Sequence, residues 1–244
     1  MIQWEDEALL LGVRRFGEAG LILDVLTQHK GRQSGLVHGG NSRRRRGQLQ
    51  PGNTLHVSWG GRIEDQLGRF DVAEAICERA ANLLEAANAL AAIAALTASL
   101  RNTLMDGDTQ GSALYPASTL LLDMLGDADE PVWAALYVRW ELGLLAMLGF
   151  GLDLSCCALS GTVEGLTHVS PRTGRAVCGA EAPDYIDRLL PLPSFLTQSD
   201  QPANPEEIGH GLILTGYFLQ RRVYEPVHRP PPEERARLIE RLER

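Results

Sequence analysis

The spacing of apolar residues changes at about residue 78. Before this point, short apolar runs alternate with glycine and asparagine, which is typical of β-strands joined by tight turns. After it, apolar residues recur every three or four positions, as on one face of an α-helix. A strand-rich segment followed by a helix-rich one predicts an α+β protein with domains at residues 1–78 and 79–244.

Five strands are expected in the first domain, at residues 7–15, 21–28, 35–38, 55–59 and 66–76. Five short strands in a segment of this size fit the OB-fold, a small barrel that commonly binds single-stranded nucleic acid or oligosaccharides. The second domain is expected to be all-helical, because Gly107, Gly126 and Pro131 mark helix ends or starts. Its expected helices lie at residues 80–105, 112–125, 132–148, 183–190, 206–221 and 233–244.

Basic residues are concentrated in the strand-rich part, although the whole chain carries a formal net charge of -8. Between Arg14 and Arg69, ten Lys or Arg stand against four Asp or Glu. Residues 43–46 form an arginine run flanked by glycines, which let a backbone approach a ligand closely. Guanidinium groups pair bidentately with phosphate, so we predict a nucleic-acid-binding surface. Its candidate contacts are Arg14, Arg15, Lys30, Arg32, Arg43, Arg44, Arg45, Arg46 and Arg62.

Alternatives stay open for these residues. A run of like charges is often a solvated loop without a partner. Phe16 and Trp59 are either platforms on which bases stack or, as is commoner for aromatic residues, parts of the barrel core. If the arginine run neutralises four phosphates of a single strand, log affinity falls against log salt with a slope of about -3.

Six segments, in this order, resemble the RecO family of bacterial recombination mediators. Three lie in the strand-rich part: GEAGLILDVLTQHKGRQSGLVHGG (residues 17–40), SRRRRGQLQPG (42–52) and GGRIEDQLG (60–68). Three lie in the helical part: RWELGLLAMLGFGLDLSCCALSG (139–161), HVSPRTGRAV (168–177) and LLPLPSFL (189–196). The resemblance covers nearly the whole chain and implies an N-terminal OB-fold followed by a helical domain.

The resemblance also implies a function in DNA repair. RecO-like proteins bind single- and double-stranded DNA, anneal complementary strands, engage the single-stranded DNA-binding protein SSB, and act with RecR to load RecA. The basic OB-fold surface carries the DNA in this family, so the arginine run is its expected centre. No enzymatic activity is implied, and the sequence contains no Gly-x-x-x-x-Gly-Lys-Ser/Thr loop for nucleotide phosphates.

Arg139 is the candidate contact for the acidic C-terminal tail of SSB. In the family, a helix with the pattern Arg-aromatic-Glu-Leu lies near the tail site, and residues 139–142 read Arg-Trp-Glu-Leu. An arginine beside an apolar groove would pair with the terminal carboxylate of the tail. The alternative is that Arg139 pairs with an internal acid such as Glu141.

Residues 152–180 resemble a degenerate zinc finger. Some family members hold a structural zinc with two Cys-x-x-Cys pairs. Here one cysteine of each pair is missing, because residues 157–160 read Cys-Ala-Leu-Ser and residues 175–178 read Arg-Ala-Val-Cys. A closed zinc site takes four nitrogen or sulfur ligands. The set Cys156, Cys157, His168 and Cys178 would supply four, but two adjacent cysteines fit one ion poorly. We predict a metal-free remnant and no cofactor.

Two other functions and the location of the protein complete the expectations. The first alternative is an RNA- or ribosome-associated OB-fold factor. Such a factor also needs a basic barrel, so only the family resemblance separates it from a DNA-binding protein. The second alternative is a metalloenzyme, and the missing metal ligands argue against it. No apolar run is long enough to span a bilayer, and the first residues are acidic, unlike a secretory signal. We expect a cytoplasmic, nucleoid-associated protein with reduced cysteines and no membrane contact.

Overall fold

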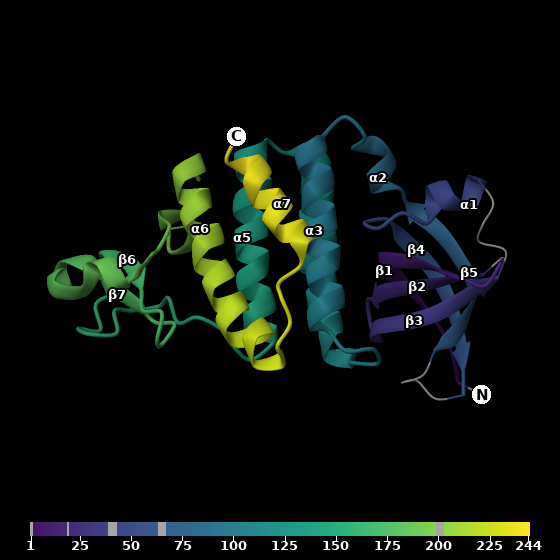
Figure 1. Cartoon of the computed structure of the whole chain (residues 1–244), viewed down its shortest axis with the longest axis horizontal. Helices are drawn as coiled ribbons and strands as arrows, with labels where there is room; N and C mark the ends of the chain where they lie inside the picture. The colour runs from purple at the N-terminus through teal and green to yellow at the C-terminus, as the bar shows by residue number, and fades with distance from the viewer. Residues whose placement is uncertain (1, 19, 39–42, 63–66, 199–202) are drawn as a thin grey trace. The chain divides into compact units, whose positions relative to one another are not determined.

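The computed structural model describes residues 2–18, 20–38, 43–62, 67–198 and 203–244 (Figure 1). The chain forms two compact units, one of residues 1–127 with 232–238 and one of residues 128–231 with 239–244. The predicted domains, residues 1–78 and 79–244, divide the chain where strands give way to helices, and that division stays a prediction. In the compact units, the helices that directly follow the barrel group with it rather than with the later helices.

The first unit contains a five-stranded barrel made of β1 (Ile2–Phe16), β2 (Gly20–Thr27), β3 (Gly31–His38), β4 (Thr54–Gly61) and β5 (Gly68–Cys77). The strands pair in the order β1-β2-β3-β5-β4, and β4 pairs again with β1, so the sheet closes. All pairs are antiparallel except β3 with β5. This arrangement confirms the predicted OB-fold.

Trp59 lies at the centre of the barrel core. It is fully buried, its ring stacks on Trp4 at a centroid distance of 5.3 Å, and its indole N–H donates to the carbonyl of Ser34 at 3.1 Å. A Cβ atom at Gly68 would lie 2.2 Å from this ring, and one at Gly61 would lie 2.4 Å away. The two glycines therefore let the backbone close over the indole, and Trp59 is a core residue rather than a base-stacking platform.

The arginine run belongs to a short helix, α1 (Arg43–Gln48), where the sequence left a loop open. The residue that follows, Leu49, is buried in the barrel core, and its N–H donates to the carbonyl of Arg45 at 2.8 Å. Burial of Leu49 thus anchors the end of a polar segment that has no apolar periodicity of its own.

Further helices of the first unit are α2 (Arg79–Asn82), α3 (Ala87–Thr103), a 3₁₀ helix (Thr109–Leu114) and α4 (Tyr115–Asp127). A single helix was expected at residues 80–105, but the chain is interrupted between α2 and α3. Helix α3 contacts β1 and buries small residues such as Ala92 and Ala95, which allow a close approach between helix and sheet.

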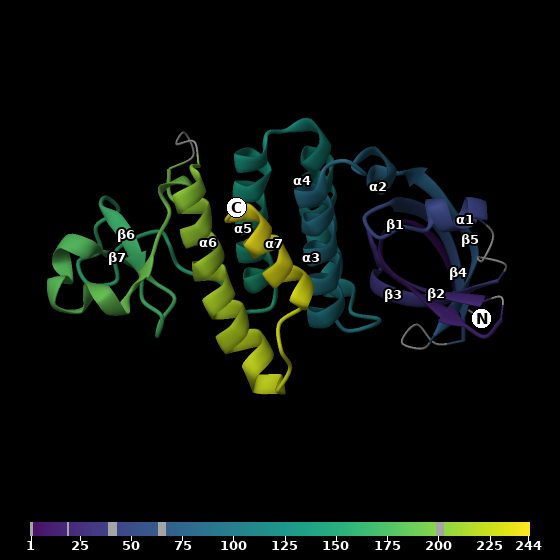
Figure 2. The same ribbon diagram turned by 45° about the horizontal axis from the view of Figure 1, so that its top comes forward.

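In the second unit, α5 (Glu130–Met147) contacts α6 (Pro205–Phe218), which continues into a π-helical turn (Leu219–Tyr224) (Figure 2). The zinc-finger-like segment contributes β6 (Leu166–Val169) and β7 (Ala176–Cys178) to a small antiparallel sheet, and β8 (Leu190–Pro191), which follows the segment, completes it. The all-helical expectation missed this sheet because its strands are too short to show an alternating pattern. The last helix, α7 (Glu233–Leu242), has residues in both units.

Among the residues that the structure describes, no helix has both the length and the apolar character needed to cross a membrane.

Candidate nucleic-acid interface

A cleft of about 500 Å³ opens on the barrel where β1 and β4 end and β5 begins. In OB-folds the ligand lies on the barrel beside such strand ends and their connections. The cleft walls include Phe16, Leu36, Arg62, Leu67, Arg69 and Asp71. The pairing of β3 with β5 places Leu36 directly opposite Arg69. Strands far apart in the sequence therefore meet at the cleft.

The cleft lining combines apolar side chains with arginines. The Phe16 side chain lines the cleft and is 51% exposed, so its ring is accessible to a ligand there. Arg62 and Arg69 are exposed at the same cleft, and Arg69 forms an ion pair with Asp71 at 2.6 Å. An exposed ring in the same cleft as two arginines offers stacking to a base and charge pairing to the phosphates beside it.

Arg69 was not among the residues predicted from the sequence. The signal lay in the alternation of β5, where Phe70 is buried in the barrel core while Arg69 and Asp71 are on the outer face. The charge count of the strand-rich part included Arg69, but only the closed sheet brings it to the same cleft as Arg62 and Phe16.

A second hollow of about 170 Å³ links the cleft to the arginine run. It is lined by His38, Arg45, Phe70 and two residues shared with the cleft, Arg69 and Asp71. Arg45 donates through Nη1 to the carbonyl of His38 at 3.3 Å. The predicted contacts Arg43, Arg44 and Arg46 have side chains that lie outside the described residues.

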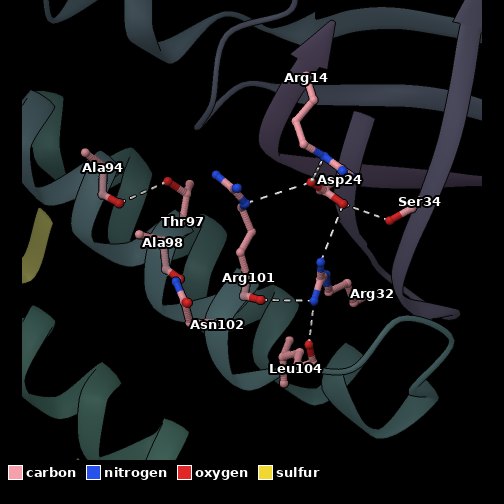
Figure 3. Close-up of polar contacts among 10 residues, drawn as sticks. All are labelled: Arg14, Asp24, Arg32, Ser34, Ala94, Thr97, Ala98, Arg101, Asn102 and Leu104. Carbon is pink, nitrogen blue, oxygen red and sulfur yellow. Dashed lines mark hydrogen bonds and ion pairs between the residues drawn. The ribbon is translucent and has the colours of Figure 1, made fainter. Parts of the chain in front are cut away.

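Three arginines surround Asp24 of β2 on the outer face of the barrel (Figure 3). Its carboxylate is 3% exposed and accepts from the hydroxyl of Ser34 at 2.8 Å. Arg14 and Arg32, both predicted contacts, lie 3.5 Å from the carboxylate oxygens, and Arg101 of α3 lies 3.8 Å away. We call these residues the Asp24 cluster.

Arg32 has structural contacts in the fold, and its role as a DNA contact stays a prediction. Its side chain is only 17% exposed. Its Nη1 donates to the carbonyl of Arg101 at 3.0 Å and to that of Leu104 at 2.6 Å. Carbonyls at the end of a helix lack partners within the helix, so a guanidinium placed there satisfies them and complements the helix dipole. Arg32 thus joins β3 to the end of α3.

The other predicted contacts have different surroundings. Arg14 and Arg15 are exposed near the end of β1, beside Phe16. Lys30 lies in the turn between β2 and β3, where its N–H donates to the hydroxyl of Thr27 at 2.8 Å. The structure thus brings Arg45, Arg62 and Phe16 to the cleft and its neighbouring hollow, and it places Arg14 in the Asp24 cluster.

Arg139 on α5 is exposed and contacts Phe195. Its Nη2 donates to the carbonyl of Phe195 at 2.6 Å, and its guanidinium lies 5.8 Å from the centroid of the same ring. Glu141, which was the alternative partner, is fully buried and accepts from the hydroxyl of Thr215 at 2.5 Å. No ion pair between Arg139 and an acid occurs among the described residues.

The zinc-finger-like segment brings Cys157 to Glu181 rather than to a set of metal ligands. The buried Cys157 sulfur accepts from the N–H of Cys178 at 3.2 Å and lies 3.2 Å from a carboxylate oxygen of Glu181. Burial raises the pKa of the Cys157 thiol, but N–H donors led by Cys178 outweigh it and lower that pKa below its ordinary value. Within the described ranges, no three His, Cys, Asp or Glu are grouped to hold a metal.

Comparison with known proteins identifies the family. The model of a family described as "Recombination protein O N terminal" matches residues 1–78, and that of "Recombination protein O C terminal" matches residues 67–231. The chain belongs to the RecO family. This finding confirms the resemblance drawn from six segments, and it assigns the chain to DNA repair and recombination.

Similar RecO proteins cover the chain from end to end. DNA repair protein RecO of Hyphomonas neptunium is 59% identical over 241 residues, which are 99% of this chain and 98% of that protein. The protein of the same name from Rhodospirillum rubrum is 45% identical over 248 residues, covering 100% of this chain and 98% of its own. That of a Ruegeria species is 43% identical over 244 residues, covering 100% and 99%.

Proposed function

We propose that this RecO-family chain is a recombination mediator that binds single- and double-stranded DNA through its barrel. In this proposal it anneals complementary strands and acts with RecR to load RecA on DNA coated with SSB, in the cytoplasm and at the nucleoid. The observation that carries the proposal is the cleft on the barrel, where exposed Phe16 lies with Arg62 and Arg69.

Base stacking explains how the cleft would hold a strand of any sequence. Every base has a π-face, so a ring such as Phe16 binds without reading hydrogen-bond patterns. Arginines at the edges bind phosphates, which carry no sequence information. A strand held in this way keeps its Watson–Crick edges available, which annealing requires.

Charge distribution explains where DNA would bind. The net charge of -8 is the sum of an excess of basic residues between Arg14 and Arg69 and a strongly acidic remainder. Acidic surface repels a phosphate backbone, and a basic surface attracts it and speeds encounter. DNA is therefore expected on the barrel, and its binding is expected to weaken as salt rises.

The first test of the cleft is Phe16→Ala, which is expected to lower affinity for single-stranded DNA about tenfold, because loss of base stacking on an aromatic ring costs about 1–3 kcal/mol. Annealing of complementary strands coated with SSB is expected to slow with it. Binding is measured with a fluorescent oligonucleotide and annealing by strand-pairing fluorescence.

The matched controls for this test are Phe16→Trp, which keeps the stacking surface, and Tyr185→Ala, which removes an exposed aromatic residue from the second unit. Both are expected to bind and anneal like the wild type. Equal binding by the wild type and Phe16→Ala would show that the cleft does not hold the bases.

Arg139→Ala is expected to lower affinity for a peptide that copies the acidic C-terminal tail of SSB about tenfold, because a charge-assisted hydrogen bond contributes about 1.5–3 kcal/mol. One terminal nitrogen of Arg139 already donates to the carbonyl of Phe195, which fixes the side chain. Arg139→Lys keeps the charge and is expected to retain part of the affinity. Titration calorimetry measures both, and an unchanged Kd for Arg139→Ala would contradict the assignment.

A further inference from the structure

In the Asp24 cluster, three guanidinium groups share one carboxylate. Oδ1 accepts from the Ser34 hydroxyl at 2.8 Å and lies 3.5 Å from Nη2 of Arg32. Oδ2 lies 3.5 Å from Nε of Arg14 and 3.8 Å from Nε of Arg101 (Figure 3). Oδ1 therefore contacts residues of β3, whereas Oδ2 is shared by an arginine of β1 and an arginine of α3.

The cluster has an excess of two positive charges, since three arginines surround one aspartate. Arg32 is mostly buried and donates to backbone carbonyls. The Arg14 side chain is 56% exposed and that of Arg101 is 41% exposed. Figure 3 shows the terminal nitrogens of Arg101 turned away from Asp24. The uncompensated charge therefore lies on the two exposed arginines.

Gly12 makes room for the Arg101 guanidinium. A Cβ atom at this position would lie 2.8 Å from Nη1 of Arg101. Gly12 follows an irregularity in the pairing of β1 with β2, where the register shifts after Leu10. The side chain from α3 thus lies across a strand position without a side chain, and its Nε lies 3.8 Å from the Asp24 carboxylate.

We propose that Arg14 and Arg101 together bind one phosphate of a nucleic-acid backbone and so extend the cleft toward α3. Arg14 lies two residues from Phe16 on the same face of β1, about 7 Å away along the strand. Both guanidiniums lie against Asp24 Oδ2 through Nε, and terminal guanidinium nitrogens are the donors that phosphate prefers. This inference rests on the proposed function, and Arg101 is a contact that only the folded chain reveals.

Asp24 serves as the positioning residue of this subsite. Two guanidiniums that approach one point repel each other, and a buried carboxylate between them offsets the repulsion before a phosphate arrives. The two side chains are thereby held near their binding positions, which reduces the conformational entropy lost on binding. The backbone carbonyl of Arg101 accepts from Arg32. Arg101→Gln keeps this carbonyl and removes only the guanidinium.

The test compares single-stranded DNA binding by full-length Arg14→Gln, Arg101→Gln and the double variant between 50 and 200 mM salt. Each single change is expected to weaken binding at low salt about tenfold. The double variant is expected to lose much less than the product of the two, since both groups bind one phosphate. Its slope of log affinity against log salt is expected to fall in magnitude by about 0.7.

Two further variants separate geometry from charge. Gly12→Ala keeps every charge but pushes the Arg101 guanidinium aside, and it is expected to weaken binding in the same direction as Arg101→Gln. Arg237→Gln removes one exposed positive charge, which pairs with Glu233 on its own helix, and is expected to bind like the wild type.

The outcomes distinguish this subsite from the proposed function. If Arg101→Gln binds like Arg237→Gln while Phe16→Ala still weakens binding, the phosphate subsite is wrong and the DNA-binding cleft stands. If losses at Arg14 and Arg101 multiply in the double variant, the two residues do not share a phosphate. If the wild type binds no DNA, both proposals fall.

Discussion

Replacing Arg43, Arg44, Arg45 and Arg46 together with alanine is expected to reduce the salt dependence of single-stranded DNA binding. Four phosphates neutralised by these residues contribute a slope of about -3 in log affinity against log salt. The same four contacts predict roughly a fifty-fold loss of wild-type affinity between 50 and 200 mM salt. The measurement is Kd at several salt concentrations, together with annealing of complementary strands coated with SSB.

The fold is expected to survive this change, because alanine favours a helix and the buried Leu49 anchors the end of α1. Melting curves check this point. A matched control removes four exposed arginines near the C-terminus, Arg229, Arg237, Arg241 and Arg244. An unchanged salt slope in the run variant, equal to that of the control, would show that the arginine run is solvated and binds no phosphate.

Asp24→Asn is expected to lower the free energy of unfolding by about 3 kcal/mol, because removing one partner of a buried ion pair leaves the other charge uncompensated. The buried partner is Arg32, which is 17% exposed, and the Asp24 carboxylate also lies 3.5 Å from Arg14 and 3.8 Å from Arg101. For a chain of this size the melting temperature is expected to fall by about 6–12 °C. Thermal and urea unfolding measure the effect.

Controls apportion that loss among the contacts of Asp24. Ser34→Ala removes only the 2.8 Å hydrogen bond and is expected to cost about 1 kcal/mol. Adding Arg101→Gln to Asp24→Asn removes one of the repelling charges and is expected to restore part of the stability. If Asp24→Asn unfolds like the wild type, the cluster does not hold the barrel and α3 together.

Two aromatic residues show why burial was harder to predict than secondary structure. Phe16 and Trp59 both lie near strand ends and both were open candidates for base stacking. The structure buries Trp59 completely and leaves Phe16 half exposed. The decision comes from Gly61 and Gly68, which close over the Trp59 ring, and from the strand pairing that brings them there. The residues next to Trp59 in the sequence do not predict that these glycines cover its ring.

The sequence alone determined the five-stranded OB-fold, most of the helices and the concentration of arginine in the barrel. These properties depend on spacing and composition within a few residues, which periodicity reports directly. The tertiary structure decided that Arg69 shares a cleft with Phe16, that Arg32 binds helix carbonyls, and that Asp24 gathers Arg14 and Arg101. Such contacts join residues from different strands and a helix, so they exist only after the barrel closes in register and α3 packs against it.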